Sequence, residues 1–234
     1  MSVTAETLLS SLSRLPLADW RSELMQFRSS DDLRAYLAAL LSDSNALDEM
    51  ARASFYHPTG GFKLVLASHG YDGPELRLHI WPQGAKVERD HNMYSVHNHK
   101  WSFASLVLHG TMAEQIFSES FDATEWLYDR YRFGSRVRGG EYESVLVGPR
   151  YLKELFCTTI PAGTAYTQAS ETLHNFQPAG ETLAMTLFAR TAYAASHTDV
   201  FVPSGAHVVL DGNGPERILR ATAGELLELA RDSL

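Results

Sequence analysis

The sequence has a single cysteine, Cys157, among its 234 residues, so no disulfide can form within the chain. Cysteine this sparse is typical of proteins in a reducing compartment, and a cytoplasmic location is therefore expected. The first residues lack the basic start and the apolar run of a secretory signal peptide. No run reaches about 18 apolar residues, the length that a membrane-spanning helix needs, so no membrane partner is expected.

Positive charge is also scarce, and no stretch is rich in lysine and arginine. Lys and Arg number 20 against 28 Asp and Glu, which gives a formal net charge of −8. Because binding to nucleic acid requires a basic surface against the phosphates, a nucleic-acid partner is not expected. The 44% of hydrophobic residues is ordinary for a globular protein, and the length is sufficient for a sizeable core.

Helical patterns occupy both ends of the sequence, where apolar residues recur at helical spacing. Thr4 is placed to cap the first helix, and Thr222 with Glu225 forms a capping-box pattern before the last. The predicted helices cover 8–17, 29–41, 44–54 and 226–234.

Between these ends, short runs rich in β-branched and aromatic residues alternate with turn signals. Many short strands at such spacing indicate a β-sandwich or a barrel. The predicted strands cover 62–68, 76–81, 94–99, 103–109, 111–117, 125–133, 142–148, 151–160, 164–169 and 182–190. Because no repeat or linker interrupts the chain, we expect one domain over 1–234. Its predicted parts are N-terminal helices over 1–54, a barrel over 61–210 and a C-terminal helix over 215–234.

Two histidines, His97 and His99, stand one residue apart in a predicted strand. Residues i and i+2 of a strand point to the same face, so both imidazoles project together while Asn98 faces away. Two neutral imidazoles at that separation can ligate one divalent transition metal, although ordinary polar residues near a strand end would show the same pattern. A metal usually needs a third protein ligand, and His174 is the only histidine in the stretch 164–180 that follows a Pro-Ala-Gly turn. The sequence therefore predicts a metal site with three histidines.

These motifs resemble those of the cupin superfamily: His-x-His, an apolar strand that ends at Gly110, and Pro-x-Gly followed by a late histidine. The resemblance covers roughly residues 61–190. It implies a mainly β fold, a cupin-type (jelly-roll) β-barrel with helices at both ends, a metal in the barrel mouth and a homodimer. Two positions depart from the pattern. Phe103 stands where cupins commonly carry a glutamate ligand, and Tyr166 stands three residues after Pro-x-Gly, where the late histidine commonly falls.

Three histidines without the glutamate are similar to the cysteine dioxygenase-like branch of cupins, which also has helices before the barrel. That branch implies Fe(II), with Ni, Mn or Zn as alternatives, and open positions for O₂ and for a small acidic, thiol-bearing or amine-bearing substrate. Thr186 and Phe188 occupy the strand in which members acting on thiols carry a Ser-His-Tyr relay. Phe103 replaces a cysteine that some members crosslink to a tyrosine. Cysteine itself is therefore not predicted as the substrate.

Several other side chains near the motifs are candidates for the site. Lys63 and Arg77 could hold an acidic substrate group, although either could instead be a solvated or ion-paired strand residue. Lys63 falls close to where thiol dioxygenases carry an arginine that binds a carboxylate. We expect His79 to act as an acid or base or to support a ligand, and Tyr166 to hydrogen-bond a metal-bound group. Two aromatic residues are expected to line the substrate site, although core packing would use them equally well: Trp101 and Phe103.

Two classes of function are consistent with these patterns. The first is an enzyme, a mononuclear non-haem iron dioxygenase whose partners are a small-molecule substrate and O₂. A close variant of it is a metal-dependent isomerase or lyase that does not use O₂. The second is a non-catalytic protein that binds a small molecule in the barrel mouth. The fold alone cannot decide between them, because one fold hosts many functions.

Overall fold

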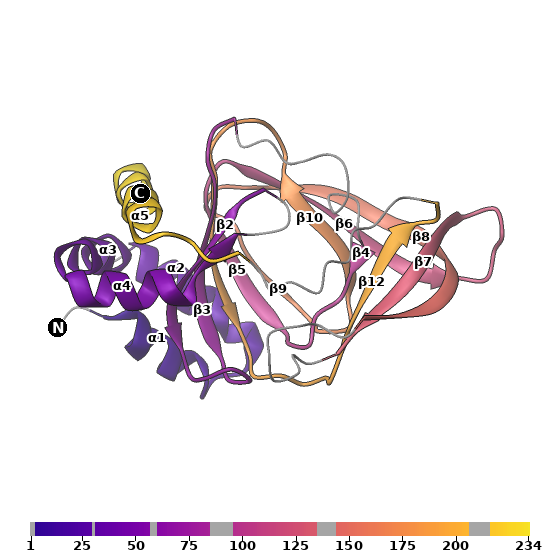
Figure 1. Ribbon diagram of the computed structural model, residues 1–234, viewed down its shortest axis with the longest axis horizontal. Coiled ribbons are helices and arrows are strands. Elements are labelled where there is room, and N and C mark those ends of the chain that lie inside the picture. The colour runs from indigo at the N-terminus through magenta and orange to yellow at the C-terminus, as the bar shows by residue number, and fades with distance from the viewer. Residues whose placement is uncertain (1–2, 30, 57–59, 85–95, 135–143, 206–215) are drawn as a thin grey trace.

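The computed structural model describes residues 3–29, 31–56, 60–84, 96–134, 144–205 and 216–234. Within these residues the protein is mainly β, with two antiparallel sheets, helices before them and a helix after them, as predicted. The helices gather at one end of the molecule, and both chain termini lie there (Figure 1). No helix in the described part of the chain is long and apolar enough to cross a membrane.

The helices differ from the predicted ones at several boundaries. The Thr4 hydroxyl accepts a hydrogen bond from the Thr7 amide at 3.2 Å, which confirms the predicted cap. The first helix ends at Leu12 rather than at residue 17, and the last begins at Arg220. Thr222 therefore lies inside the last helix, and the predicted capping box is wrong. The helices are α1 (Ala5–Leu12), a 3₁₀ turn η1 (Leu17–Asp19), α2 (Trp20–Ser29), α3 (Asp32–Ser42), α4 (Ser44–Ala53) and α5 (Arg220–Ser233).

Most predicted strands are present, and the differences concern their boundaries and number. The predictions 142–148 and 151–160 are wrong as separate strands, because pairing continues through both as one long strand. Residues 94–95 and 142–143 of two predicted strands, and 206–210 of the predicted barrel, lie outside the described residues. The strands are β1 (Phe55–Tyr56), β2 (Phe62–Ser68), β3 (Glu75–Trp81), β4 (Val96–His97), β5 (Phe103–His109), β6 (Thr111–Ser120), β7 (Trp126–Phe133), β8 (Ser144–Pro161), β9 (Ala165–Gln168), β10 (Leu173–Pro178), β11 (Ala184–Arg190) and β12 (Thr198–Pro203).

The strands form two sheets of different kinds. The first sheet is open and has the order β1-β2-β3-β11-β5-β9. The second sheet closes on itself in the order β10-β4-β12-β7-β8-β6, because β6 pairs again with β10. The long strand β8 makes this closure possible, since residues 144–152 pair with β7 and residues 151–161 pair with β6.

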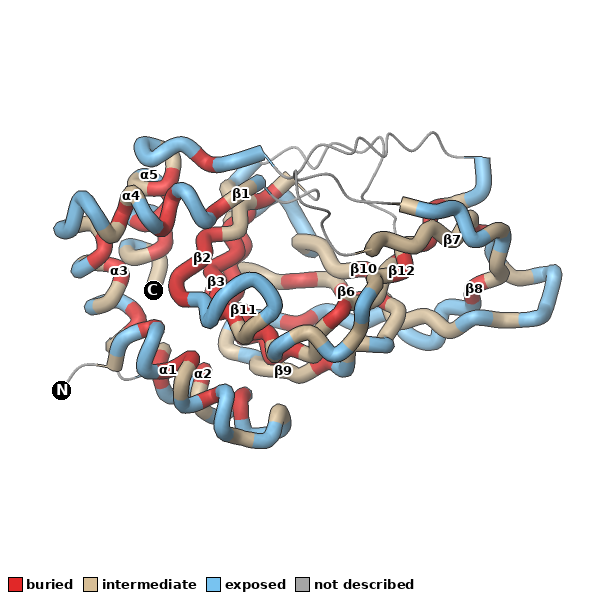
Figure 2. Tube along the Cα trace, turned by 60° about the horizontal axis from the view of Figure 1, so that its bottom comes forward, coloured by how far each residue is buried: buried red, intermediate tan, exposed pale blue. Residues whose placement is uncertain are grey.

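One face of the first sheet forms the main hydrophobic core with the helices. Residues that pair across neighbouring strands share a face, and one such row is Leu64, Leu78, Leu187 and Leu106. These leucines are fully buried and belong to a cluster that includes apolar residues of all five α-helices. Figure 2 shows buried segments concentrated in β2, β3 and the adjacent helices, whereas much of β8 is exposed.

The opposite face of the first sheet carries polar and aromatic side chains instead. One row across the strands runs Lys63, His79 and Thr186. The next row contains Arg77, Phe188, Ser105 and Tyr166. Thr186, Ser105, His79 and Arg77 are all buried. A face of this composition is unsuited to plain core packing, because buried polar groups are costly unless they find partners.

Candidate metal centre

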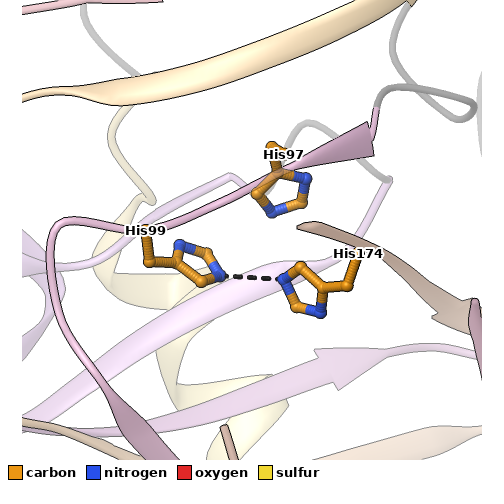
Figure 3. A group of neighbouring side chains, drawn as sticks. All are labelled: His97, His99 and His174. Atoms are coloured by element: carbon orange, nitrogen blue, oxygen red, sulfur yellow. Dashed lines mark hydrogen bonds between the residues drawn. The ribbon is translucent and has the colours of Figure 1, made fainter. Parts of the chain in front are cut away.

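Two histidines of the second sheet and one just beyond it converge on one point, as Figure 3 shows. His97 is the last residue of β4, His99 follows it by two, and His174 lies on β10 directly opposite His97. The ring centroids of the three pairs lie 4.8, 4.9 and 5.1 Å apart. One nitrogen from each ring lies within 4.8 Å of the others, so the group could hold a metal ion. The structure thus brings together the three residues that the sequence predicts as ligands.

The backbone that positions His97 and His99 differs from the predicted regular strand. The two rings project together as predicted, but β4 ends at His97, so His99 reaches the group from beyond the regular strand. The backbone amide of His99 donates to the carbonyl of Ser170 at 2.9 Å, which fixes its position beside β10. The Asn98 side chain accepts a hydrogen bond from the backbone amide of Asp199 at 2.7 Å. Asn98 therefore anchors the segment to β12.

His174 lies on a strand that the sequence analysis places in a connection. Tyr166 of β9 pairs with Ser105 of β5, so the chain after the Pro-x-Gly turn first completes the first sheet. It then turns at residues 169–172 and enters the second sheet as β10. His174 comes further along the chain than the histidine of the usual pattern because it lies on β10, the second strand after the Pro-x-Gly turn.

The surroundings of His99 and His174 keep these two imidazoles neutral. Burial lowers the pKa of His174 to about 4. Burial also holds the pKa of His99 well below its usual value, and its interactions with the neighbouring imidazoles and with the charges of Lys63 and Arg77 lower it further. Neutral imidazoles have a free lone pair, which is the form that binds a metal.

The spacing of two of the ring nitrogens also suits a metal ion. Nε2 of His99 and Nε2 of His174 lie 3.1 Å apart. Two nitrogens that bind one ion at right angles, each at about 2.1 Å, lie about 3 Å apart. The nitrogen donors and the spacing of the His99–His174 pair therefore fit a divalent transition metal.

Aromatic side chains surround the histidine group. Trp101 stacks on the His99 ring with centroids 5.3 Å apart and planes at 20°. Phe103, which is 2% exposed, lies 5.4 Å from the His99 ring and 5.9 Å from the His174 ring. The position where cupins commonly carry a glutamate ligand thus presents an apolar ring to the group. Within the described residues, the group that could hold a metal contains histidines alone.

The other predicted site residues lie on the polar face of the first sheet. His79 stacks on Phe188 with centroids 4.9 Å apart. Its pKa lies well below the usual value because of burial, with Lys63 and Arg77 lowering it further. The Tyr166 ring lies 6.1 Å from Phe103, and burial raises the pKa of its hydroxyl, so the group stays protonated.

Lys63 and Arg77 differ in how their charges are balanced. Arg77 forms an ion pair with Glu75, which also accepts a hydrogen bond from Arg190 at 3.2 Å. Of the two roles considered for Arg77, substrate binding or a structural ion pair, the structure shows the ion pair. No ion pair among the described residues involves Lys63, whose ammonium lies 5.7 Å from the Phe55 ring. Burial and, to a smaller extent, the charge of Arg77 lower the pKa of Lys63 to about 7, with Glu75 partly opposing both.

Sequence reasoning missed two buried polar residues beside the histidines. Glu114 of β6 places its Oε1 atom 3.5 Å from Nδ1 of His174. Gln168 of β9 donates a hydrogen bond to the same Glu114 oxygen at 3.1 Å. One signal could have identified Glu114: it alternates with the buried Met112 along β6, so it occupies an inward position of that strand.

The sequence matches no protein-family model and no curated protein. Its fold has remote likenesses among solved structures. An RmlC-like cupin from Shewanella frigidimarina superposes with a TM-score of 0.32 and 12% identity over 58% of this chain and 79% of that chain. Hydroquinone 1,2-dioxygenase from a Sphingomonas species, with 4-hydroxybenzoate bound, has a TM-score of 0.29 and 11% identity over 53% of this chain and 63% of that chain. An oxalate decarboxylase variant from Bacillus subtilis has a TM-score of 0.33 and 13% identity over 61% of this chain and 28% of that chain.

Proposed function

We propose that this protein is a metal-dependent oxidoreductase of cupin type, a mononuclear non-haem iron dioxygenase that acts on a small metabolite. The observation that carries the proposal is the group of His97, His99 and His174. It offers three histidine nitrogen donors and no carboxylate. Fe(II) held by three protein ligands keeps open coordination positions, at which it can bring a substrate and O₂ together.

The residues around the histidines support this chemistry by shielding it from water. Trp101 and Phe103 contact the ligand rings directly, and Phe188 packs against Phe103 with centroids 4.8 Å apart. An apolar surround keeps bulk water from competing with a substrate for the open positions. It also strengthens every electrostatic contact that the substrate makes inside.

The charges near the histidines favour an acidic substrate. Lys63 lies close enough to lower the pKa of both His79 and His99, and no acid among the described residues forms an ion pair with it. An anionic group of the substrate, such as a carboxylate, would supply the missing partner. Arg77 is already ion-paired with Glu75, so we assign it a structural role in the site. Tyr166, protonated at neutral pH, would donate a hydrogen bond to a bound group, and His79 would accept or donate one.

Oxygen consumption tests the proposal. Protein reconstituted anaerobically with Fe(II) should consume O₂ only when one member of a panel of small carboxylic acids, amino acids and thiols is added. His99→Ala should abolish this uptake. Lys63→Met should raise the KM for an acidic substrate while the protein retains its iron. Conversion of a substrate with Ni, Mn or Zn and without O₂ uptake would replace the dioxygenase by an isomerase or lyase.

A further inference from the structure

A buried carboxylate faces the side of His174 that is turned away from His99. The ring of His174 presents Nε2 to His99 at 3.1 Å, as the dashed line in Figure 3 shows. Its other nitrogen, Nδ1, lies 3.5 Å from Oε1 of Glu114. His174 is 3% exposed and Glu114 is 7% exposed, so water has little access to this contact.

Glu114 is held in place and lacks an obvious structural countercharge. Gln168 donates to its Oε1 atom at 3.1 Å, and β6 pairs with β10 so that Glu114 lies opposite Phe176. Within the described part of the chain, no lysine or arginine forms an ion pair with Glu114. A buried carboxylate is costly unless a positive charge compensates it. A divalent ion bound to the far nitrogen of His174 would provide that charge.

We propose that Glu114 is a positioning residue of the metal centre, whose carboxylate accepts the Nδ1–H of His174 and leaves Nε2 free to bind the ion. The inference rests on the proposed metal site and is independent of whether O₂ is used. Histidine ligands commonly donate their second N–H to a carboxylate, which fixes the tautomer and the ring orientation.

This arrangement also explains how the site works with Phe103 in place of a glutamate ligand. Three neutral histidines leave the full double charge on the ion. A carboxylate behind His174 lowers that charge without occupying a coordination position. The open positions stay free, and the aromatic surround of the ion is kept.

Metal affinity and the His174 tautomer together test the proposal. Affinity for Fe(II) would be measured anaerobically by chelator competition, and the tautomer by ¹⁵N-histidine NMR of the apo and the Zn(II)-loaded protein. Glu114→Leu should weaken metal binding by about 10- to 100-fold. Glu114→Gln keeps an acceptor oxygen and should lose less. His174 should carry its proton on Nδ1 in the wild type.

Glu154→Gln is the matched control. Glu154 is an exposed residue of β8 and accepts a hydrogen bond from the Gln115 amide at 2.7 Å, so the same kind of carboxylate–amide pair is removed away from the histidines. Its metal affinity should equal that of the wild type. Thermal unfolding of each apo variant checks that the fold is intact.

The outcomes separate this inference from the proposed function. A wild type that binds no metal would refute the metal site and this inference with it. A wild type that binds metal, beside a folded Glu114→Leu variant of equal affinity, would overturn the role of Glu114 alone. A His174 proton on Nε2 in the apo wild type would also overturn it, and that measurement needs no variant.

Discussion

At the scale of single residues, Lys63 and Arg77 show how an ion-pair partner decides whether a buried basic residue is compensated. Both are basic residues on neighbouring strands and on the same face of the first sheet. Arg77 has Glu75 as its ion-pair partner, whereas Lys63 relies on the Phe55 ring and its surroundings. The pKa of Lys63 falls to about 7 as a result of burial and of the charge of Arg77. Lys63 is therefore the cation whose charge a ligand can most easily change.

The stability of the protein should depend on pH through Lys63. Its pKa of about 7 in the folded state is below its ordinary value of 10.5, so between these values the unfolded chain binds more protons. The contribution of Lys63 to the free energy of unfolding therefore rises with pH across this window. Lys63→Met should flatten the rise, as measured by urea unfolding between pH 7 and pH 10. Identical slopes for Lys63→Met and the wild type would contradict the buried position of the ammonium group. Lys153→Met, at an exposed position of β8, is the control.

Only part of the candidate site could be predicted from residue identity and spacing. His97, His99 and His174 were predictable because metal ligation restricts both residue type and spacing. Glu114 was not, because its role depends on the pairing of β6 with β10, which brings two distant segments together. The ion pair of Arg77 with Glu75 joins residues two apart on β3 and was within reach of the sequence. The contact of Glu75 with Arg190 was not, because Arg190 belongs to a strand more than a hundred residues later.

At the scale of elements, β12 holds the histidine-bearing segment in place. The backbone groups of Asp199 pair with Asn98, between the two histidines. The Asp199 carboxylate binds Arg130 and also accepts a hydrogen bond from Arg132 at 3.1 Å. Burial alone would raise the pKa of Asp199, but the hydrogen bonds and charges of the two arginines outweigh it and lower the pKa. The element thus joins β7 to the segment that carries His97 and His99.

Asp199→Asn should destabilise the protein in a pH-dependent manner. Because the folded pKa is below the unfolded one, the ionised carboxylate contributes stability at neutral pH that is lost as pH falls through the folded pKa. We expect a loss of about 1–3 kcal/mol at pH 7, as for a hydrogen-bonded charged group. The difference from wild type should shrink as pH falls below about 4, when unfolded aspartates also become protonated.

Urea unfolding at pH 7 and at pH 3 measures this difference. Asp129→Asn on β7, whose carboxylate accepts from Ser204 near the surface at 3.3 Å, is the control. An equal loss at both pH values would show that the carboxylate acts through packing rather than through its charge.

Elements with a strong apolar period were predictable, and those that depend on tertiary contacts were not. β2, β5 and β11 follow the predicted strands closely, because buried β-branched and aliphatic residues dominate them. α2 was missed because its buried residues, Trp20, Leu24 and Phe27, are spread among charged and polar ones. β10 and β12 were missed because each is short and mixes polar with apolar residues. Pairing with their neighbours stabilises these two strands.

At the scale of the whole molecule, the first sheet separates two environments. One face packs with the helices into an apolar core that stabilises the fold. The other face turns charged, hydroxyl and aromatic groups toward the histidines of the second sheet, as the contacts of Phe103 show. The mainly β fold with helices at both ends was predictable, because strand and helix patterns occupy separate parts of the sequence. A barrel was predicted, but not that one sheet closes while the other stays open, because this closure depends on the length of β8. The homodimer stays a prediction, which sedimentation velocity can check.

The central claim is that the three histidines hold one metal ion, and elemental analysis tests it most directly. The protein would be purified anaerobically, without added metal or chelator, as wild type, His97→Ala, His99→Ala and His109→Ala. We expect iron near one atom per chain in the wild type and in His109→Ala, and almost none in the other two variants. Metal far below one per chain in the wild type, not restored by added Fe(II), would contradict the account. Equal retention in all four proteins would contradict it as well.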